Sequence, residues 1–248
     1  MCTVSWFTTS TGYELFFNRD EQRSRSDALT PQVFQENNVD YIMPIDPFGG
    51  GSWISLNNNG ISLCLLNYYQ GETAPSNALS RGLLIKKLAP CEHIDSIQEV
   101  LSNIELSRFA AFTLLIFHAS GSVKNERVYG FRWDGRTFES INPSSPMISS
   151  SVDADNVIEH RLSVYKELTN SAVNRQTLNQ FHQHHHSKLG HRSPCMHRQD
   201  AQTVSFTHII VSNKNNSLHY FPGSPCQIKK HLAYDDPFHF YDNTHSYN

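Results

Sequence analysis

The chain begins with Met1 followed directly by Cys2. Methionine aminopeptidase generally removes an initiator methionine when the second residue is small, as cysteine is. The mature chain would then begin at Cys2, which would carry both a thiol and a free α-amine. The amine has an ordinary pKa of about 7.7–8.0, so part of it is neutral at pH 7 and can accept a proton. Position two therefore predicts a nucleophile that carries its own base. The alternative is a cysteine that stands there by chance.

A hairpin is predicted to bring polar residues to this cysteine. Residues 2–7 and 13–17 have the pattern of strands, and the TTSTG segment at 8–12 has the composition of a turn. If the two strands pair, the Asn18-Arg19-Asp20 segment lies close to Cys2.

Each of these polar residues has a possible role in such a site. Arg19, with Asn18 beside it, is predicted to bind a substrate carboxylate or to lower the pKa of the thiol. Asp20 is predicted to hold the α-amine. The alternative is an ordinary charged strand end with no part in chemistry.

Asn67 ends a strand that is predicted to be buried. Residues 61–66 are apolar on both faces, and they follow a strand at 52–56 and an Asn57–Gly60 turn. A side-chain amide at the end of such a strand can donate to an oxyanion. A hydrogen-bonded turn asparagine is the alternative for Asn67.

The remaining elements alternate in blocks of strands and helices, which is typical of α+β layers and not of a doubly wound parallel fold. Two sheets packed face to face, with helices on their outer faces, would accommodate these strands and helices. We expect one domain over residues 1–248, with an irregular tail at 235–248. The predicted helices are 77–88, 94–104, 155–168 and 174–186, and the further predicted strands are 41–44, 111–118, 126–133, 136–141, 203–211 and 217–221.

Composition excludes several classes of protein. The formal net charge of −3 gives no sign of the excess positive charge that binding to nucleic acid or to an anionic membrane would need. No apolar stretch is long enough to span a bilayer. Five scattered cysteines argue against a disulfide framework, and no signal peptide is evident. A cytoplasmic protein with reduced thiols is expected.

The segment 181–198 is rich in histidine. His182 and His186 are spaced as a helical metal pair would be, but a solvated helix end and loop is the favoured explanation, and no metal site is predicted. His197 and Arg198 come just before a strand that is expected to reach the central sheets. They are therefore the better candidates for substrate binding.

Several short blocks, in order and spacing, resemble the NRDE family of the transport-and-Golgi-organisation type. That family is similar in turn to N-terminal nucleophile hydrolases of the choloylglycine hydrolase and acyltransferase type. The matching blocks are Met1-Cys2, Asn18-Arg19-Asp20-Glu21, Gly50–Trp53 leading to Gly60, Leu66-Asn67-Tyr68, Ser80-Arg81-Gly82, Cys195-Met196-His197, Thr203–Phe206 and Gly223–Cys226.

The resemblance implies a four-layer αββα sandwich. It further implies that Cys2 is the nucleophile, that Asp20 lies beside its amine and that Asn67 donates to the oxyanion. Those hydrolases also carry a second asparagine in the middle of the chain, where this sequence has serines at 149–151. Asn142 is a possible substitute.

Two functions follow as hypotheses. The first is a cysteine hydrolase or acyltransferase, without a cofactor, that acts on a C–N amide bond of a small acylated substrate. The second is a non-enzymatic protein of the same fold that binds or traffics haem or an acyl lipid, suggested by the missing second asparagine and the histidine-rich segment. Glutamine amidotransferase domains, which also expose a terminal cysteine, typically begin Cys-Gly-Ile, and Cys2-Thr3-Val4 does not fit them.

Overall fold

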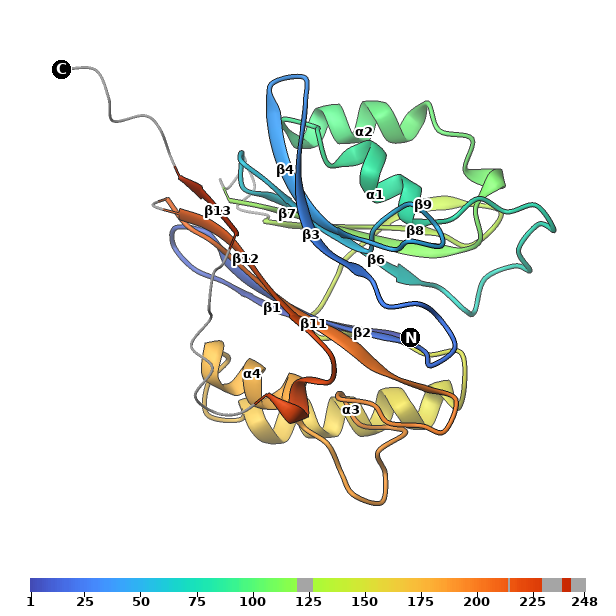
Figure 1. The fold of residues 1–248 in the computed structure, drawn as a ribbon, viewed down its shortest axis with the longest axis vertical. Helices are drawn as coiled ribbons and strands as arrows, with labels where there is room; N and C mark the ends of the chain where they lie inside the picture. The colour runs from blue at the N-terminus through green and yellow to red at the C-terminus, as the bar shows by residue number, and fades with distance from the viewer. Residues whose placement is uncertain (120–126, 214, 229–237, 242–248) are drawn as a thin grey trace.

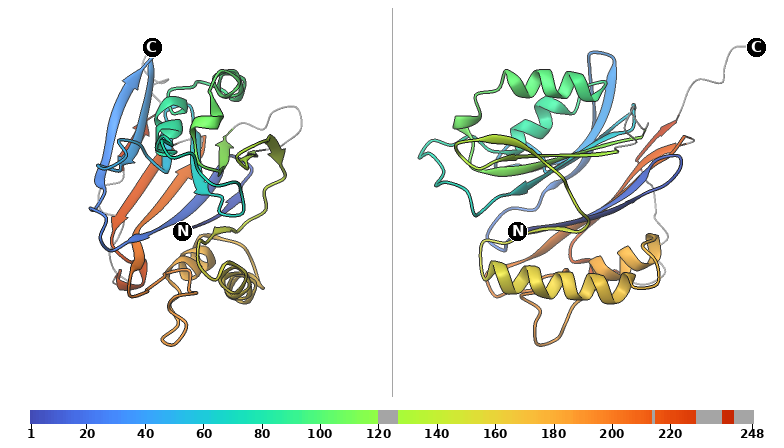
Figure 2. Two further views of the ribbon diagram at one scale, coloured as in Figure 1. Left: turned by 90° about the vertical axis from the view of Figure 1, so that its right-hand side faces the viewer. Right: turned by 180° about the vertical axis from the view of Figure 1, so that it is seen from behind.

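A computed structural model describes residues 1–119, 127–213, 215–228 and 238–241 (Figure 1). Two antiparallel sheets pack face to face, and a pair of helices covers the outer face of each (Figures 1 and 2). The layers therefore follow the order helix, sheet, sheet, helix, as expected from the sequence.

The first sheet has six strands in the order β10-β1-β2-β11-β12-β13. It contains the predicted hairpin, in which Cys2 lies opposite Arg19 and Thr3 lies opposite Asn18, so this prediction is confirmed. The strands are β1 (Cys2–Thr8), β2 (Tyr13–Gln22), β10 (Met147–Ser149), β11 (Ala201–Val211), β12 (Asn215–Pro222) and β13 (Phe238–Tyr241).

The second sheet has seven strands in the order β3-β4-β5-β6-β7-β8-β9. Neighbouring strands in the chain are neighbours in the sheet, so it is a simple meander. The strands are β3 (Leu29–Glu36), β4 (Val39–Ile45), β5 (Ile54–Asn57), β6 (Ile61–Asn67), β7 (Phe112–His118), β8 (Val128–Trp133) and β9 (Phe138–Ile141).

The helices lie in two pairs. The first pair, α1 (Gly82–Leu88) and α2 (Ile94–Ser102), covers the seven-stranded sheet, and the second pair, α3 (Ala154–Thr169) and α4 (Arg175–Gln183), covers the six-stranded sheet (Figure 1). Short 3-10 turns follow at η1 (Leu106–Arg108) and η2 (Pro225–Gln227). Within the described ranges, none of the helices is long and apolar enough to cross a membrane.

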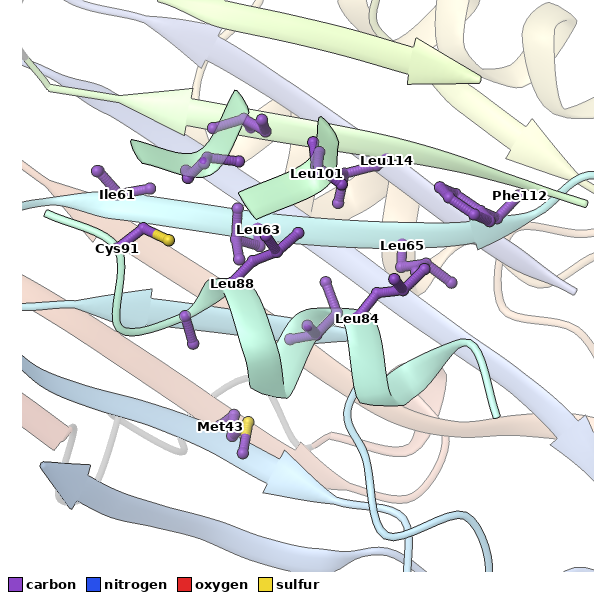
Figure 3. Packing of buried hydrophobic residues seen from close by; sticks show 14 of the residues in the cluster. Met43, Ile61, Leu63, Leu65, Leu84, Leu88, Cys91, Leu101, Phe112 and Leu114 are labelled. Carbon is purple, nitrogen blue, oxygen red and sulfur yellow. The ribbon is translucent and has the colours of Figure 1, made fainter. Parts of the chain in front are cut away.

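Apolar side chains fill all three interfaces between the layers. Leu84 and Leu88 of α1 lie over Leu63 and Leu65 of β6 in the outer layer (Figure 3). A second cluster, which includes Val4, Leu15 and Leu66, lies between the sheets, and a smaller one at Phe16, Leu178 and Phe206 lies under α4. Burial of this surface is the main force that holds the layers together.

Some elements differ from the predictions. The region after residue 18, where only a strand at 41–44 was predicted, contains the rest of β2 and the β3–β4 hairpin, whose two-residue turn has Asn37 and Asn38 at positive φ. Strand β3 is an exposed edge strand, so it lacks the alternation that reveals a strand. Helix α1 begins at Gly82, because Leu79 instead donates its backbone N–H to the Arg108 carbonyl at 2.8 Å.

Two short strands were missed. Strand β10 pairs with β1, placing Ser149 opposite Cys2. Strand β13 lies inside the segment expected to be an irregular tail, and it pairs with β12. A three- or four-residue strand carries too little sequence pattern to be recognised without its partner.

A buried ion pair joins the six-stranded sheet to α3. The Arg161 guanidinium lies 3.1 Å from the Asp20 carboxylate, and both side chains are fully buried. The other Asp20 oxygen accepts a hydrogen bond from the Thr203 hydroxyl at 2.6 Å. Arg161 also donates to the Arg192 carbonyl at 3.2 Å and contacts the Thr3 hydroxyl. Every charge in this group therefore has a partner.

We expect Arg161→Ala to destabilise the fold by about 3–5 kcal/mol, because it leaves the Asp20 carboxylate buried without its counter-ion. The double variant Arg161→Ala/Asp20→Ala should lose less stability than the sum of the two single variants. Urea unfolding of the four proteins measures the coupling. Additive losses would contradict a buried ion pair at this position.

Candidate active site

A cleft of about 620 Å³ opens beside Cys2. Strands β1 and β2 supply one wall, with Cys2 and Arg19. The other sheet and its loops supply the facing wall, with Trp53, Asn67 and Arg81. The start of the chain lies at one end of the six-stranded sheet, above α3 (Figure 1). The site thus lies where the two sheets face each other at that end.

Strand alternation sends the Cys2 thiol toward the second sheet. Cys2 packs with the cluster between the sheets, together with Val4 two residues later on the same face. Burial raises the pKa of the thiol; the chain's amine and Arg19 act in the opposite direction, and Asp20 adds to the rise. A base close to the thiol is therefore needed to form the thiolate at neutral pH.

Arg19 lies on the same face as Cys2. Its guanidinium stacks 4.2 Å from the centre of the Trp53 ring and lies 3.3 Å from the Glu21 carboxylate and 3.9 Å from that of Asp46. Its side chain is almost fully buried. The arginine is therefore held in place before any substrate binds.

Asp20 points the other way, into the helix layer, where Arg161 and Thr203 occupy its carboxylate. Its backbone, however, touches the chain start: the Asp20 N–H donates to the Met1 carbonyl at 3.0 Å, and the Met1 amine donates to the Asp20 carbonyl at 3.3 Å. The structure thus brings Asp20 to the terminus through its main chain. A carboxylate–amine contact stays a prediction.

Asn67 borders the cleft at the end of β6. Its side-chain amide donates to the Tyr69 hydroxyl at 2.8 Å, and this hydroxyl lies 3.5 Å from the Met1 amine. One amide hydrogen of Asn67 takes part in this bond, and the carboxamide has a second one. An amide donor therefore borders the cleft, and its role toward an oxyanion stays a prediction.

Two other predicted residues lie elsewhere. Asn18 is completely buried on the helix side of the sheet and donates to the carbonyls of His182 and Pro194, each at 2.9 Å. Asn142 is exposed after β9 and is not among the described residues that line the cleft. Ser149, in contrast, pairs directly with Cys2, and the hydroxyl of the next residue, Ser150, lies 2.7 Å from the Met1 sulfur.

Arg198 and His197 lie near the site without entering the main cleft. Arg198 lines a separate hollow of about 100 Å³ that Met1 and Tyr69 also line, and it is ion-paired with Asp200. The His197 ring contacts the thiol of Cys226, 3.2 Å from its Nε2. Neither residue lines the cleft that contains Cys2.

Arg81 is a cleft residue to which the sequence analysis assigned no role. It precedes α1 and donates to the Ala111 carbonyl at 3.0 Å. Burial lowers its pKa, while the nearby Tyr69, Cys2 and Glu21 favour its charged form. The available signal was that Arg81 belongs to the Ser80-Arg81-Gly82 block, within the predicted helix at 77–88.

The cleft wall at Arg81 depends on close contact between two backbones. The Ser52 N–H donates to the Gly82 carbonyl at 3.1 Å. A Cβ atom at Gly51 would lie 2.2 Å from the Gly82 carbonyl carbon, which leaves no room for any side chain. The glycine run before Trp53 therefore lets the loop approach α1.

Comparison with solved structures shows the same fold in known hydrolases. A Caenorhabditis elegans N-acylethanolamine-hydrolyzing acid amidase orthologue matches with a TM-score of 0.56 and 10% identity, covering 85% of this chain and 92% of that one. A conjugated bile acid hydrolase from Clostridium perfringens, crystallised with its cysteine at position 2 replaced by alanine, matches with a TM-score of 0.50 and 11% identity, covering 100% and 97%. At this identity the likeness establishes the fold alone.

Comparison at the level of sequence identifies the family. No curated protein matches the chain. The family model described as Transport and Golgi organisation 2 (TANGO2), however, matches residues 1–221, which include the strands around Cys2, the Asn18–Glu21 segment and all four helices. The chain therefore belongs to the Transport and Golgi organisation 2 family, and its fold is that of the N-terminal nucleophile hydrolases.

Proposed function

We propose that the protein, after removal of Met1, is an N-terminal cysteine hydrolase or acyltransferase that acts on a C–N amide bond. The observation that carries this proposal is the position of Cys2: it begins a buried strand, faces a large cleft and lies opposite Arg19. The shared fold supports it, since two solved proteins of that fold are named as an amidase and a bile acid hydrolase.

The terminal amine supplies the base that the buried thiol needs. In the chain with Met1, the amine belongs to Met1. Burial alone would lower its pKa, but the electrostatic interactions with Cys2, Tyr69 and Asp20 outweigh this, and the pKa of the Met1 amine is raised. Removal of Met1 moves the amine onto Cys2 itself, within reach of the thiol directly or through one water. It also frees the Asp20 N–H from the Met1 carbonyl.

The reaction then follows in two steps. The Cys2 sulfur attacks the amide carbonyl carbon, an S–C bond forms, and the thiol proton passes to the α-amine. The Asn67 amide donates to the resulting oxyanion. The C–N bond breaks, the α-ammonium returns its proton to the leaving amine, and an acyl thioester remains on Cys2. Water or an acceptor amine attacks this thioester and releases the acyl group.

The cleft favours an acyl group with an apolar part. Trp53, Leu65, Leu79 and Leu83 supply apolar surface along it, and Arg81 supplies a cationic group. A substrate with a short apolar acyl chain and one polar or anionic group would use both features. The lining of the cleft therefore indicates a chemical class of substrate and no particular compound.

Ligand binding without turnover is the second candidate. Ser149 lies opposite Cys2, and the exposed Asn142 is not in the cleft, so the second asparagine of the related hydrolases has no counterpart among the described cleft residues. A haem or an acyl lipid held in the cleft would need no such donor. Spectral titration with haem tests this candidate directly.

A trapped acyl-cysteine is the decisive prediction for the enzyme. After incubation with N-acyl and acyl-thioester compounds, we expect intact and peptide mass spectrometry to find an adduct on the peptide that begins at Cys2. Cys2→Ala should give none. Cys91→Ala is the matched control, since this cysteine lies in the outer core, and it should keep the adduct. Retention of Met1 in the native protein would refute the mechanism.

The pH dependence of Cys2 alkylation tests the amine. In a chain with an N-terminal extension, the raised pKa of the buried thiol should keep alkylation by iodoacetamide slow at pH 7, with the rate rising above pH 9. In the processed chain the adjacent ammonium lowers the pKa of the thiol. Each unit by which this pKa falls gives about tenfold more thiolate at pH 7. Equal rates at pH 7 in the two proteins would show that the amine does not activate the thiol.

The oxyanion role of Asn67 is separable from its bond to Tyr69. We expect Asn67→Ala to lower the rate of acylation by about 10²–10³-fold, the usual cost of one oxyanion donor. Tyr69→Phe removes only the hydroxyl that Asn67 contacts and should change the rate much less. Stopped-flow measurement of acylation compares the two variants, and equal losses would mean that Asn67 acts only by holding Tyr69.

A further inference from the structure

Three potential metal ligands converge outside the cleft, on the other side of β11. Cys195 Sγ lies 3.7 Å from His197 Nε2, and this nitrogen lies 3.2 Å from Cys226 Sγ. The three ligand atoms all lie within 4.8 Å of one another. Cys195 is buried, whereas Cys226 is at the surface, so an ion can enter from solvent. The two segments are about thirty residues apart in the sequence.

These separations match those of a tetrahedral zinc site. Zn–S bonds of about 2.3 Å and Zn–N bonds of about 2.1 Å place sulfur and nitrogen ligands about 3.6 Å apart at a tetrahedral angle. The two observed S···N distances lie on either side of this value. Two thiolates and one imidazole are also a ligand set that zinc prefers, and three protein ligands leave a fourth position open.

Backbone hydrogen bonds fix both segments that carry the ligands. The Cys195 N–H donates to the His184 carbonyl at 3.1 Å, and the His197 N–H donates to the Gly190 carbonyl at 3.0 Å. Before Cys226, the Gly223 N–H donates to the Val204 carbonyl at 2.7 Å. The geometry is therefore largely formed before a metal binds.

A second histidine stands beside this group. The ring centre of His185 lies 4.6 Å from that of His197, and its Nδ1 contacts the Cys195 carbonyl oxygen at 3.2 Å. Gly190 leaves space for this ring, because a Cβ there would lie 2.5 Å from His185 Cε1. The His197 imidazole is thus flanked by a second imidazole.

We propose that Cys195, His197 and Cys226 bind a divalent metal ion of the zinc class, with water in the fourth position. The ion would clamp η2 to the loop before β11. The Met196 N–H donates to the Thr203 hydroxyl at 2.8 Å, and this hydroxyl donates to Asp20. The metal would therefore steady the loop that supports the Asp20–Arg161 pair, independently of any reaction at Cys2.

Cobalt(II) is the probe that tests the proposal. The reduced, metal-free protein is titrated with Co²⁺ and followed by absorption spectroscopy. We expect one equivalent to bind with a sulfur-to-cobalt charge-transfer band and the intense d–d bands of tetrahedral coordination, and Zn²⁺ should abolish both. Cys226→Ser should weaken binding by at least about a hundredfold, since loss of even an outer-shell partner costs 10–100-fold.

Matched variants separate this site from other metal-binding groups. Cys91→Ser, which removes a thiol elsewhere, and His160→Gln, which removes a histidine whose ring lies near those of His184 and His186, should both keep the charge-transfer band. Zn²⁺ should also raise the midpoint of thermal unfolding in the native chain and not in Cys226→Ser. Cobalt bound without the sulfur band would assign binding to the histidines alone and overturn the proposal.

A disulfide is the competing use of the two thiols. If the protein without reductant contains a Cys195–Cys226 disulfide by peptide mass spectrometry, and the reduced form shows no cobalt charge transfer, the metal site does not exist. Failure of the acyl-cysteine experiment leaves these readouts unchanged, because none of them depends on Cys2.

Discussion

The buried ion pair between Asp20 and Arg161 is the constraint on which the site depends. Two charges without solvent are tolerable only if each has a partner, and here Thr3, Thr203 and the Arg192 carbonyl complete the group. The pair fixes the end of β2 against α3. Because side chains alternate along a strand, a fixed Asp20 on the helix side also fixes Arg19 on the cleft side, opposite Cys2. One interaction thus sets the orientation of the strand end for chemistry.

The two faces of β2 therefore have different tasks. The helix side holds Asn18 and Asp20 in hydrogen bonds that tie the strand to the last turn of α4, to Pro194 and to α3. The cleft side presents Arg19, whose stacking on Trp53 links the first sheet to the second. A bulge in β11 between Thr203 and Ser205 lies beside this point, as bulges often do next to functional sites. The Asn18–Glu21 segment thus anchors the strand to the helix layer on one face and presents Arg19 to the cleft on the other.

The sequence predicted the hairpin, the buried strand β6 and the layer order, because each depends on local alternation or on turn residues. Strict alternation along β2 would also have placed the side chains of Asp20 and Arg19 on opposite faces of the sheet, which is how the structure has them. Which residues stand where the related hydrolases have their second asparagine, Asn142 or the serines at 149–151, depends on the pairing of β10 with β1. A strand of three residues is too short for its sequence pattern to reveal this pairing. Likewise, Cys195 and Cys226 become neighbours only through the packing of η2 on β11, which no local signal reveals.

Under the proposed mechanism, Met1 would let the fold form before the thiol becomes reactive. While Met1 is present, its carbonyl accepts the Asp20 N–H and its sulfur contacts Ser150, so the strand end is fully bonded. The thiol is then buried with a raised pKa and carries no amine on its own residue. Loss of Met1 would change little of the core, since the layers are held by apolar packing and by the Asp20–Arg161 pair. In the proposed mechanism it would nevertheless free a backbone N–H and place an amine on the same residue as the thiol. A single residue, not a rearrangement of the fold, would therefore separate an inert chain from an acylating one.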